Sequence, residues 1–145
     1  MNNLQPQSRP APTNWTLSTL DFQRLLPLVS APEHPTAKNA LEELDQKLSN
    51  ATLVAPTQID GNVVTMNSKV LLRCASWDRP REYRLVYARH GACDPGEVSV
   101  VSPLGAGLLA SRVGARFAVG SHTSARSFEV VALTYQPESA GDWDL

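Results

Sequence analysis

The 145-residue sequence contains few side chains whose types and spacing would support covalent or metal chemistry. Three histidines, His34, His90 and His122, fall in three separate stretches that predict loops. Metal binding and general-base catalysis need several ligands or carboxylates close together, and no such cluster accompanies any of these histidines. We therefore expect solvated loop histidines, with no metal and no cofactor.

The two cysteines are too few for a disulfide framework or a zinc site. Cys74 lies in a predicted strand, where it is expected to be a small buried hydrophobe. Cys93 lies in a predicted turn beside Asp94, whose negative charge disfavours the reactive thiolate. A Cys74–Cys93 bridge is an alternative that a reducing cytoplasm disfavours. The sequence also lacks the P-loop, GxGxxG and HExxH motifs, so no catalytic residue is predicted.

The best-defined charge feature is a run of arginines interleaved with aromatic residues, namely Arg73, Arg79, Arg81, Arg84 and Arg89 with Trp77 and Tyr83. Such a mixture is typical of nucleic-acid-binding surfaces. Acidic residues interrupt the run, however, and the sequence pI of about 6.3 is far from the basic range of such proteins. We therefore favour a solvated or protein-facing basic surface.

The net charge of −1 conceals an uneven distribution along the chain. Residues 1–68 carry a balance of −2, residues 69–126 of +5 and residues 127–145 of −4. A basic middle segment between acidic ends indicates either a charged partner or self-complementary packing.

Composition predicts one globular domain with an additional arm. Hydrophobic residues make up 42% of the sequence and charged residues 19%, which is enough to bury a core. Residues 1–15, rich in Pro, Gln and Asn, predict a disordered lead. No apolar run approaches the ~20 residues of a membrane span, and the N-terminus has no apolar signal core. A cytoplasmic protein without a membrane partner is expected.

Two helices are predicted within residues 16–50. Apolar residues at helical spacing predict a first helix that starts near Thr16 or Ser18 and that Pro27 bends or ends. A second helix is predicted from Thr36, with polar residues, Lys47 among them, facing away from its leucine stripe. The proline-rich turn between the helices predicts an antiparallel helical hairpin whose arms extend only about 20 Å.

After residue 50 the pattern changes to short apolar runs that predict strands at 63–66, 70–72, 83–87, 98–101, 116–119 and 128–135. One helix interrupts these strands, with Ser102 as N-cap, Pro103 at the favoured first position and Gly114 at its end. Gly105 and Gly107 each destabilise a helix by about 1 kcal/mol, so we expect another backbone to pass close to them.

Four segments occur in an order and spacing that resembles the regulator of nucleoside diphosphate kinase (Rnk) family: VVTMNSKV at 63–70, YRLVY at 83–87, VSVVSPLGAGLLASRVGARF at 98–117 and YQPESAGDWDL at 135–145. The Ser-Pro helix block is also similar to the C-terminal domain of the Gre transcript-cleavage factors. The resemblance covers residues 16–145. It implies an α+β protein with a short N-terminal antiparallel helical hairpin and, over residues 51–145, an FKBP-like antiparallel sheet domain with one helix.

The resemblance further implies a non-enzymatic regulator that binds RNA polymerase near the mouth of its secondary channel. In the Gre factors, the C-terminal domain docks on a coiled coil of the polymerase's largest subunit, and the loop before the Ser-Pro helix is part of that docking surface. Carried over to this sequence, the polymerase-binding residues are Ser102, Pro103, Leu104 and Gly105. A stable helix start with no docking role explains the Ser-Pro pair equally well, because a cap is needed in both cases.

The predicted hairpin is far shorter than the Gre coiled coil, and its tip offers only Glu33 where Gre factors carry paired acidic residues that bind catalytic Mg²⁺. We therefore expect a monomer that competes with Gre-type cleavage factors, does not stimulate RNA cleavage, makes no direct nucleic-acid contact and affects nucleoside diphosphate kinase indirectly. Two alternatives stay open. One is an RNA-binding module that uses the arginine-rich strands, and the other is an FKBP-type prolyl isomerase, which would need an open pocket formed by Tyr83, Tyr87, Phe117 and Phe128.

Overall fold

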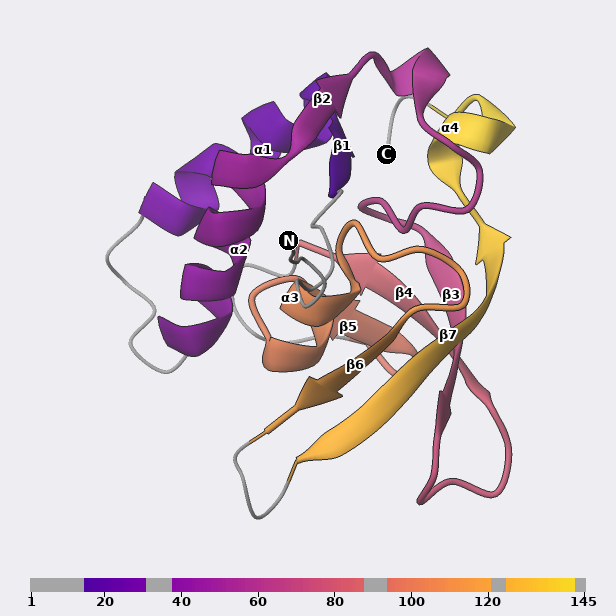
Figure 1. The fold of residues 1–145 in the computed structure, drawn as a ribbon. Coiled ribbons are helices and arrows are strands. Elements are labelled where there is room, and N and C mark those ends of the chain that lie inside the picture. The colour runs from indigo at the N-terminus through magenta and orange to yellow at the C-terminus, as the bar shows by residue number, and fades with distance from the viewer. Residues whose placement is uncertain (1–14, 31–37, 88–93, 121–124, 143–145) are drawn as a thin grey trace, which may run out of the picture.

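The computed structural model describes residues 15–30, 38–87, 94–120 and 125–142 (Figure 1). Its elements follow in the order β1 (Thr16–Ser18), α1 (Thr19–Ser30), α2 (Lys38–Asn50), β2 (Thr52–Val54), η3 (Pro56–Gln58), β3 (Lys69–Cys74), β4 (Arg81–Val86), β5 (Glu97–Ser99), α3 (Pro103–Leu108), β6 (Arg116–Val119), β7 (Arg126–Tyr135) and α4 (Pro137–Ala140). This mixture of helices and sheet confirms the predicted α+β class. The predicted disordered lead, apart from Trp15, lies outside the described residues. None of the helices in the described ranges is long and apolar enough to cross a membrane.

Five strands form one sheet in the order β5-β4-β3-β7-β6. β3 pairs antiparallel with both β4 and β7, and β7 pairs antiparallel with β6. β5, however, pairs parallel with β4, so the expectation of a purely antiparallel sheet is wrong at this edge. The connection between Val86 and Glu97 is long enough to return the chain to the beginning of β4, which a parallel pair requires.

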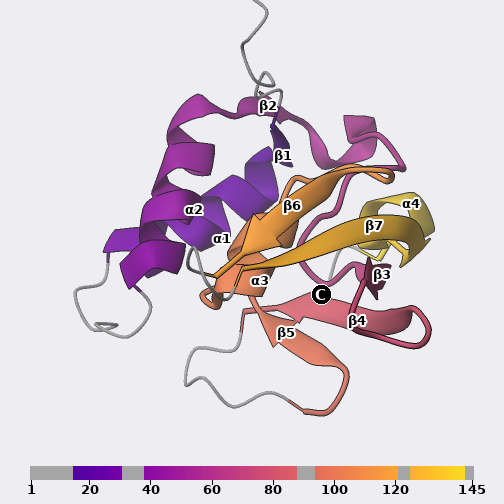
Figure 2. The same ribbon diagram turned by 60° about the horizontal axis from the view of Figure 1, so that its bottom comes forward.

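The sheet curls around α3, as Figures 1 and 2 show from two directions. Helix α3 contacts both β5 and β6, which are the two edge strands of the sheet. Side chains that alternate along the strands, such as Val70, Leu72, Leu85 and Val130, are fully buried on the inner face. Helix α3 therefore fills the space between the sheet's two edges.

The N-terminal arm, residues 15–54, consists of two helices and a small strand pair. α1 and α2 pack side by side on one flank of the molecule (Figure 1). β1 and β2 pair parallel, with Thr16 opposite Thr52. The two predicted helices are thus present, while the strand pair that brackets them is an additional element that the sequence pattern did not predict.

The ends of the arm helices match the predictions only in part. Of the two predicted starting points, Thr16 lies in β1, and Ser18 caps α1 because its Oγ accepts a 3.0 Å hydrogen bond from the backbone N–H of Asp21. Pro27 does not end α1, which continues to Ser30. The predicted start of the second helix at Thr36 lies outside the described residues.

One hydrophobic core joins the arm to the sheet. Leu25 and Leu44 from the arm helices belong to the same cluster as Leu72 and Leu85 from the sheet, and all four are fully buried. The short arm helices are therefore packed on the remainder of the chain.

Two predicted elements differ from the structure for identifiable reasons. The predicted strand at 63–66 makes only one isolated bridge, between Val63 and Arg112, and its residues are apolar because they are buried in the core. Helix α3 ends at Leu108 rather than near Gly114, because Ala110 adopts a left-handed backbone conformation with φ of 66°.

The expectation of a single helix beyond the arm is also wrong. After β7 the short helix α4 begins with Pro137 at its first position and ends at Gly141, which has a φ of 76°. Gln136 anchors this end of the chain, since its Nε2 donates 2.8 Å hydrogen bonds to the carbonyl oxygens of Asp60 and Val63. The Pro-to-Gly spacing was a helix signal that the sequence contained.

Candidate docking site

Ser102 fixes the beginning of α3 as predicted. Its Oγ accepts a 3.1 Å hydrogen bond from the N–H of Gly105 and donates a 2.6 Å hydrogen bond to the carbonyl oxygen of Ser99. Its backbone is extended, with φ of −93° and ψ of 158°, as an N-cap requires. The hydroxyl of Ser102 is thus engaged within the chain in both its donor and its acceptor role.

The four predicted docking residues differ in what they offer to a partner. Pro103 is exposed at the first helical position, and Leu104 is half-buried where it packs against the core. Ser102 is half-buried with its hydroxyl occupied, and Gly105 is buried. The surface available at this helix start is therefore the rigid Pro103 ring together with the accessible part of Leu104.

The two glycines of α3 allow close packing; the expectation of a nearby backbone is confirmed at Gly105, whereas Gly107 meets an aromatic side chain. A Cβ atom at Gly105 would overlap the carbonyl oxygen of Ser99 and lie 2.9 Å from the Cα of Val100. A Cβ atom at Gly107 would lie 2.7 Å from the ring of Phe117. The neighbour is therefore this chain's own β5 end and the β6 aromatic ring, and only glycine fits both positions.

Lys47 of α2 binds the other end of α3. Its Nζ lies 2.6 Å from the carbonyl oxygen of Ala106, 3.1 Å from that of Gly107 and 2.6 Å from that of Leu109. An ammonium group has three N–H donors, so all three can be satisfied by these carbonyls. The last carbonyls of a helix lack intrahelical partners and carry partial negative charge, which a lysine at this position compensates.

Lys47 is almost completely buried, with 3% of its side chain exposed. Burial lowers its pKa from 10.5 to about 8, against the opposing effect of Glu43, whose carboxylate lies 3.9 Å away. The ring of Trp15 lies 5.7 Å from Nζ and covers the amine from the arm side. Lys47 thus joins the arm to α3 through a protonated, enclosed amine.

The prediction that Lys47 faces away from the apolar stripe is wrong. The buried residues of α2 are Ala40, Leu44, Lys47 and Leu48, which recur at the spacing of a single helical face. The spacing therefore contained a signal, a lysine at a core position of an otherwise apolar stripe.

Asp21 makes a second connection between the arm and the sheet. Its carboxylate accepts a 3.1 Å hydrogen bond from the backbone N–H of Met66, and the residue is 3% exposed. Burial is the main cause that raises its pKa from 3.8 to about 7; the charge of Glu138 also raises it, while the Met66 N–H and Arg24 lower it. Like Lys47, Asp21 occupies a buried position of its helix, on the same face as Leu25 and Leu28.

The predicted arginine run does not form one patch in the described part of the chain. Arg73 pairs with Glu129 at 3.3 Å on the outer face of the sheet. Arg81 lies 4.4 Å from the ring of Trp77, and its register partner is the inward-facing Leu72. Arg89 lies outside the described residues. Arginines divided between two faces give no support to an RNA-binding surface of the predicted kind.

The aromatic residues pack with one another and with the core. Phe117 and Phe128 stack with their ring centres 6.0 Å apart, and Trp77 lies 5.7 Å from Phe128 and 6.1 Å from Tyr83. Tyr83 and Phe117 also pack against the core cluster, as does Tyr87. This arrangement gives no support to a prolyl-isomerase pocket.

Residues with metal-binding or redox chemistry are sparse in the described ranges. Cys74 is a buried free cysteine, as predicted. Within those ranges, no three His, Cys, Asp or Glu side chains are grouped so as to hold a metal ion. His34, His90, His122 and Cys93 all lie outside the described residues.

The sequence and the fold both place this chain in a known class of proteins. Residues 45–135 match the family model "Transcription elongation factor, GreA/GreB, C-term", and the chain belongs to this family. A solved structure of a transcription elongation factor GreA/GreB from Nitrosomonas europaea superposes with a TM-score of 0.70 at 28% sequence identity, covering 86% of this chain and 100% of that one.

Individual relatives show which members of this class the chain is similar to. The proteins named regulator of nucleoside diphosphate kinase from Escherichia coli K12 and Shigella flexneri are 34% identical over 135 residues, covering 89% of this chain and 95% of theirs. The transcription elongation factor GreA of Thermodesulfovibrio yellowstonii is 24% identical over 96 residues, covering 66% of this chain and 61% of that protein. The resemblance to the Rnk family and to the Gre C-terminal domain is confirmed.

Proposed function

We propose that this protein is a non-enzymatic transcription regulator that binds RNA polymerase near the entrance of its secondary channel and competes there with Gre-type cleavage factors. The observation that carries the proposal is the start of α3, where an exposed proline is held in place by the chain around it. Ser102 fixes the helix start, Gly105 packs against the β5 end, and Lys47 binds the helix end. A contact surface fixed in this way loses little entropy when a partner binds.

The short arm favours a role in blocking the channel entrance over one in catalysing RNA cleavage at the polymerase active centre. α1 has 12 residues and α2 has 13, so each spans about 20 Å at 1.5 Å per residue. A cleavage factor must bring acidic residues to the polymerase active centre. The proposed role is therefore that of a cytoplasmic competitor without cleavage activity, and any effect on nucleoside diphosphate kinase is proposed to follow from transcription.

A binding experiment with purified core RNA polymerase tests the proposal. The double variant Pro103→Ala with Leu104→Ala should weaken binding at least about tenfold, since it removes most of the accessible apolar surface at the helix start. Because Leu104 also packs on the core, Pro103→Asp is the sharper variant. Aspartate is favourable in the first turn of a helix but places a charge at the contact.

The matched control is Leu53→Ala, which removes an exposed leucine of the arm. It should leave binding unchanged. Displacement of labelled GreA from polymerase by the wild-type protein, but not by Pro103→Asp, is the expected competition result. Full binding by a folded Pro103→Asp protein would reject the docking site, and a wild-type protein that does not bind polymerase would reject the function.

A further inference from the structure

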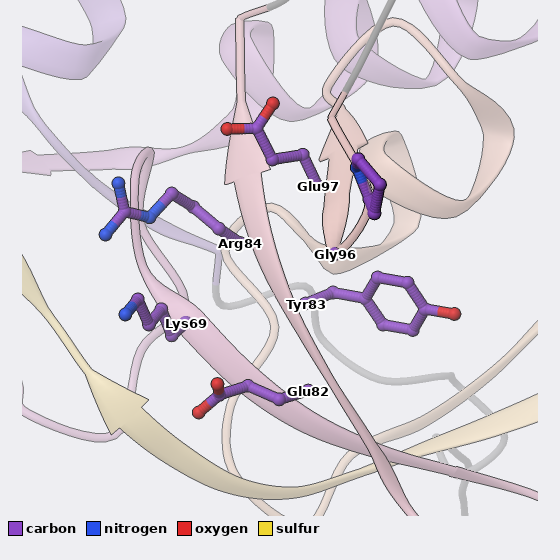
Figure 3. Close-up of a pocket in the computed structure, with 7 residues that line it drawn as sticks. Lys69, Glu82, Tyr83, Arg84, Gly96 and Glu97 are labelled. Atoms are coloured by element: carbon purple, nitrogen blue, oxygen red, sulfur yellow. The ribbon is translucent and has the colours of Figure 1, made fainter.

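A row of charged side chains crosses three strands on the outer face of the sheet. Glu97 of β5 lies opposite Arg84 of β4, Arg84 lies opposite Lys69 of β3, and Lys69 lies opposite Tyr135 of β7. Figure 3 shows Arg84 and Lys69 directed to the same side of β4, with Glu97 and Glu82 beyond them and the ring of Tyr83 on the opposite side. We call Glu97, Arg84, Lys69 and Glu82 the charged row.

The two central cations have no ion-pair partner in the described part of the chain, although acidic residues lie beside them. The ion pairs among the described residues are Lys47–Glu43, Arg73–Glu129, Arg112–Asp60 and Arg116–Glu129. Glu97 instead accepts a 3.1 Å hydrogen bond from the N–H of Asp94, and Glu82 accepts a 2.6 Å hydrogen bond from the hydroxyl of Thr134. The acidic neighbours are thus held by other groups, and Arg84 and Lys69 keep their charges available.

Two like charges directly opposite each other destabilise a sheet. Lys69 and Arg84 are both half-buried, so their stems are ordered against the sheet while their charged ends reach the surface. They line a pocket of about 270 Å³ together with Glu82, Glu97 and the turn that contains Pro95 and Gly96. A pair that costs stability at the edge of a pocket is better explained by a ligand than by the fold.

The acidic ends of the charged row determine which ligand fits. A nucleic acid or a nucleotide is uniformly anionic, so Glu82 and Glu97 would repel it on both sides of the two cations. A protein helix with acidic side chains flanked by basic ones offers the complementary order of charges. Complementarity of this kind governs association rate and register more than it governs the final affinity.

The charged row lies close to the start of α3. Ser102 follows Glu97 by five positions along the chain, and an extended chain of that length spans at most about 18 Å. Arg84 and Lys69 lie one and two strands beyond Glu97, at about 5 Å per strand, so a partner helix of about 18 residues covers the whole distance. One helix could therefore contact Pro103 and the charged row together.

We propose that the charged row is a second contact surface for a helix of mixed charge on the same partner as α3, and that its central cations receive acidic side chains of that helix. This inference rests on the proposed polymerase-binding function and adds to it the electrostatic part of the contact. Of the basic segment 69–126, Lys69 and Arg84 are then the two residues that contribute to binding of the partner.

The test compares two double charge reversals in the full-length protein. Lys69→Glu with Arg84→Glu alters the row, whereas Arg79→Glu with Arg126→Glu makes the same change in net charge at two other exposed arginines. Association with immobilised core RNA polymerase is followed at about 50 mM and about 200 mM salt. The row variant should associate about tenfold more slowly at low salt and lose most of its salt dependence, while the control should change less than about twofold.

A thermal melt separates this role from a structural one. Lys69→Gln with Arg84→Gln removes the like-charge pair, so its melting temperature should equal or exceed that of the wild type, although its association is slowed. A row variant that associates like the wild type, or no more slowly than the control, overturns the inference while leaving the α3 site intact. Binding of single-stranded RNA that only the row variant loses would also overturn it. Failure of the wild type to bind polymerase overturns both proposals.

Discussion

The replacement of Lys47 by methionine is the most informative test of how this fold is held together. Methionine has a similar length and remains apolar, so Lys47→Met keeps the volume of the side chain and removes only the ammonium. The carbonyl of Gly107 would retain its 2.7 Å hydrogen bond from the hydroxyl of Ser111. The carbonyls of Ala106 and Leu109 would lose the partner that the structure gives them.

The magnitude follows from two opposing contributions. Each buried carbonyl left without a partner costs about 1–3 kcal/mol, which gives about 2–6 kcal/mol for the pair. Relief from burying an ammonium offsets part of this loss. Because backbone carbonyls cannot be removed with their partner, the offset is smaller than in a swap of a whole buried ion pair. We expect a net loss of about 2–4 kcal/mol in the free energy of unfolding, or roughly 6–12 °C in melting temperature.

Urea denaturation at pH 7 measures this loss, with Gln46→Met as the control on the exposed face of the same helix. The control should lie within about 0.5 kcal/mol of the wild type. A Lys47→Met protein as stable as the control, or more stable, would refute the reasoning, because the three hydrogen bonds would then contribute no net stability. A Lys47→Met protein that unfolds like the wild type but binds polymerase more weakly would also contradict the proposed stabilising role of Lys47.

Four further outcomes are expected. Above pH 8 the free energy of unfolding of the wild type should rise relative to that of Lys47→Met, as urea titrations up to pH 10 can measure. The pKa of Lys47 is about 8 in the folded chain and 10.5 in the unfolded chain, so the unfolded chain holds this proton more strongly. As the pH rises from 5 to 8, the free energy of unfolding of the wild type should fall by on the order of 2–3 kcal/mol, because the folded chain, in which the pKa of Asp21 is raised from 3.8 to about 7, loses a proton that the unfolded chain has already lost. Asp21→Asn should remove this pH dependence. Gly105→Ala should destabilise by at least about 3 kcal/mol because its Cβ meets backbone, and Gly107→Ala by less because a phenyl ring can shift; melting curves rank the two. Ser102→Ala should cost about 1 kcal/mol in the same assay, and no change would mean that the cap is dispensable.

The local signals in the sequence were sufficient for the start of α3. Ser102, Pro103 and Gly105 each predicted a property that depends on short-range chemistry, namely a cap, a first helical position and a close approach of backbone. The predicted end of that helix failed because Ala110 adopts a left-handed conformation that its residue type does not signal. The parallel pairing of β5 depends on where the chain returns after β4, which strand patterns do not encode.

The connections between the arm and the sheet were missed for a different reason. Lys47 and Asp21 occupy core positions of their helices, but a charged residue is assigned to the solvent side unless its partner is known. The partners are backbone groups 59 or more residues away for Lys47 and 45 residues away for Asp21. A backbone carbonyl or N–H has no sequence signature, so only the assembled fold identifies these contacts.

The contact of Lys47 with the end of α3 also limits how the length of the arm can be changed in this chain. An arm exchanged as a whole at residue 51 would take Lys47 and Asp21 with it and leave the carbonyls at the end of α3 exposed or unpaired. Helical turns inserted far from these two residues would disturb neither connection. A longer arm built on this chain should therefore be extended at its distal end, while the turns next to the sheet, which carry Lys47 and Asp21, stay as they are.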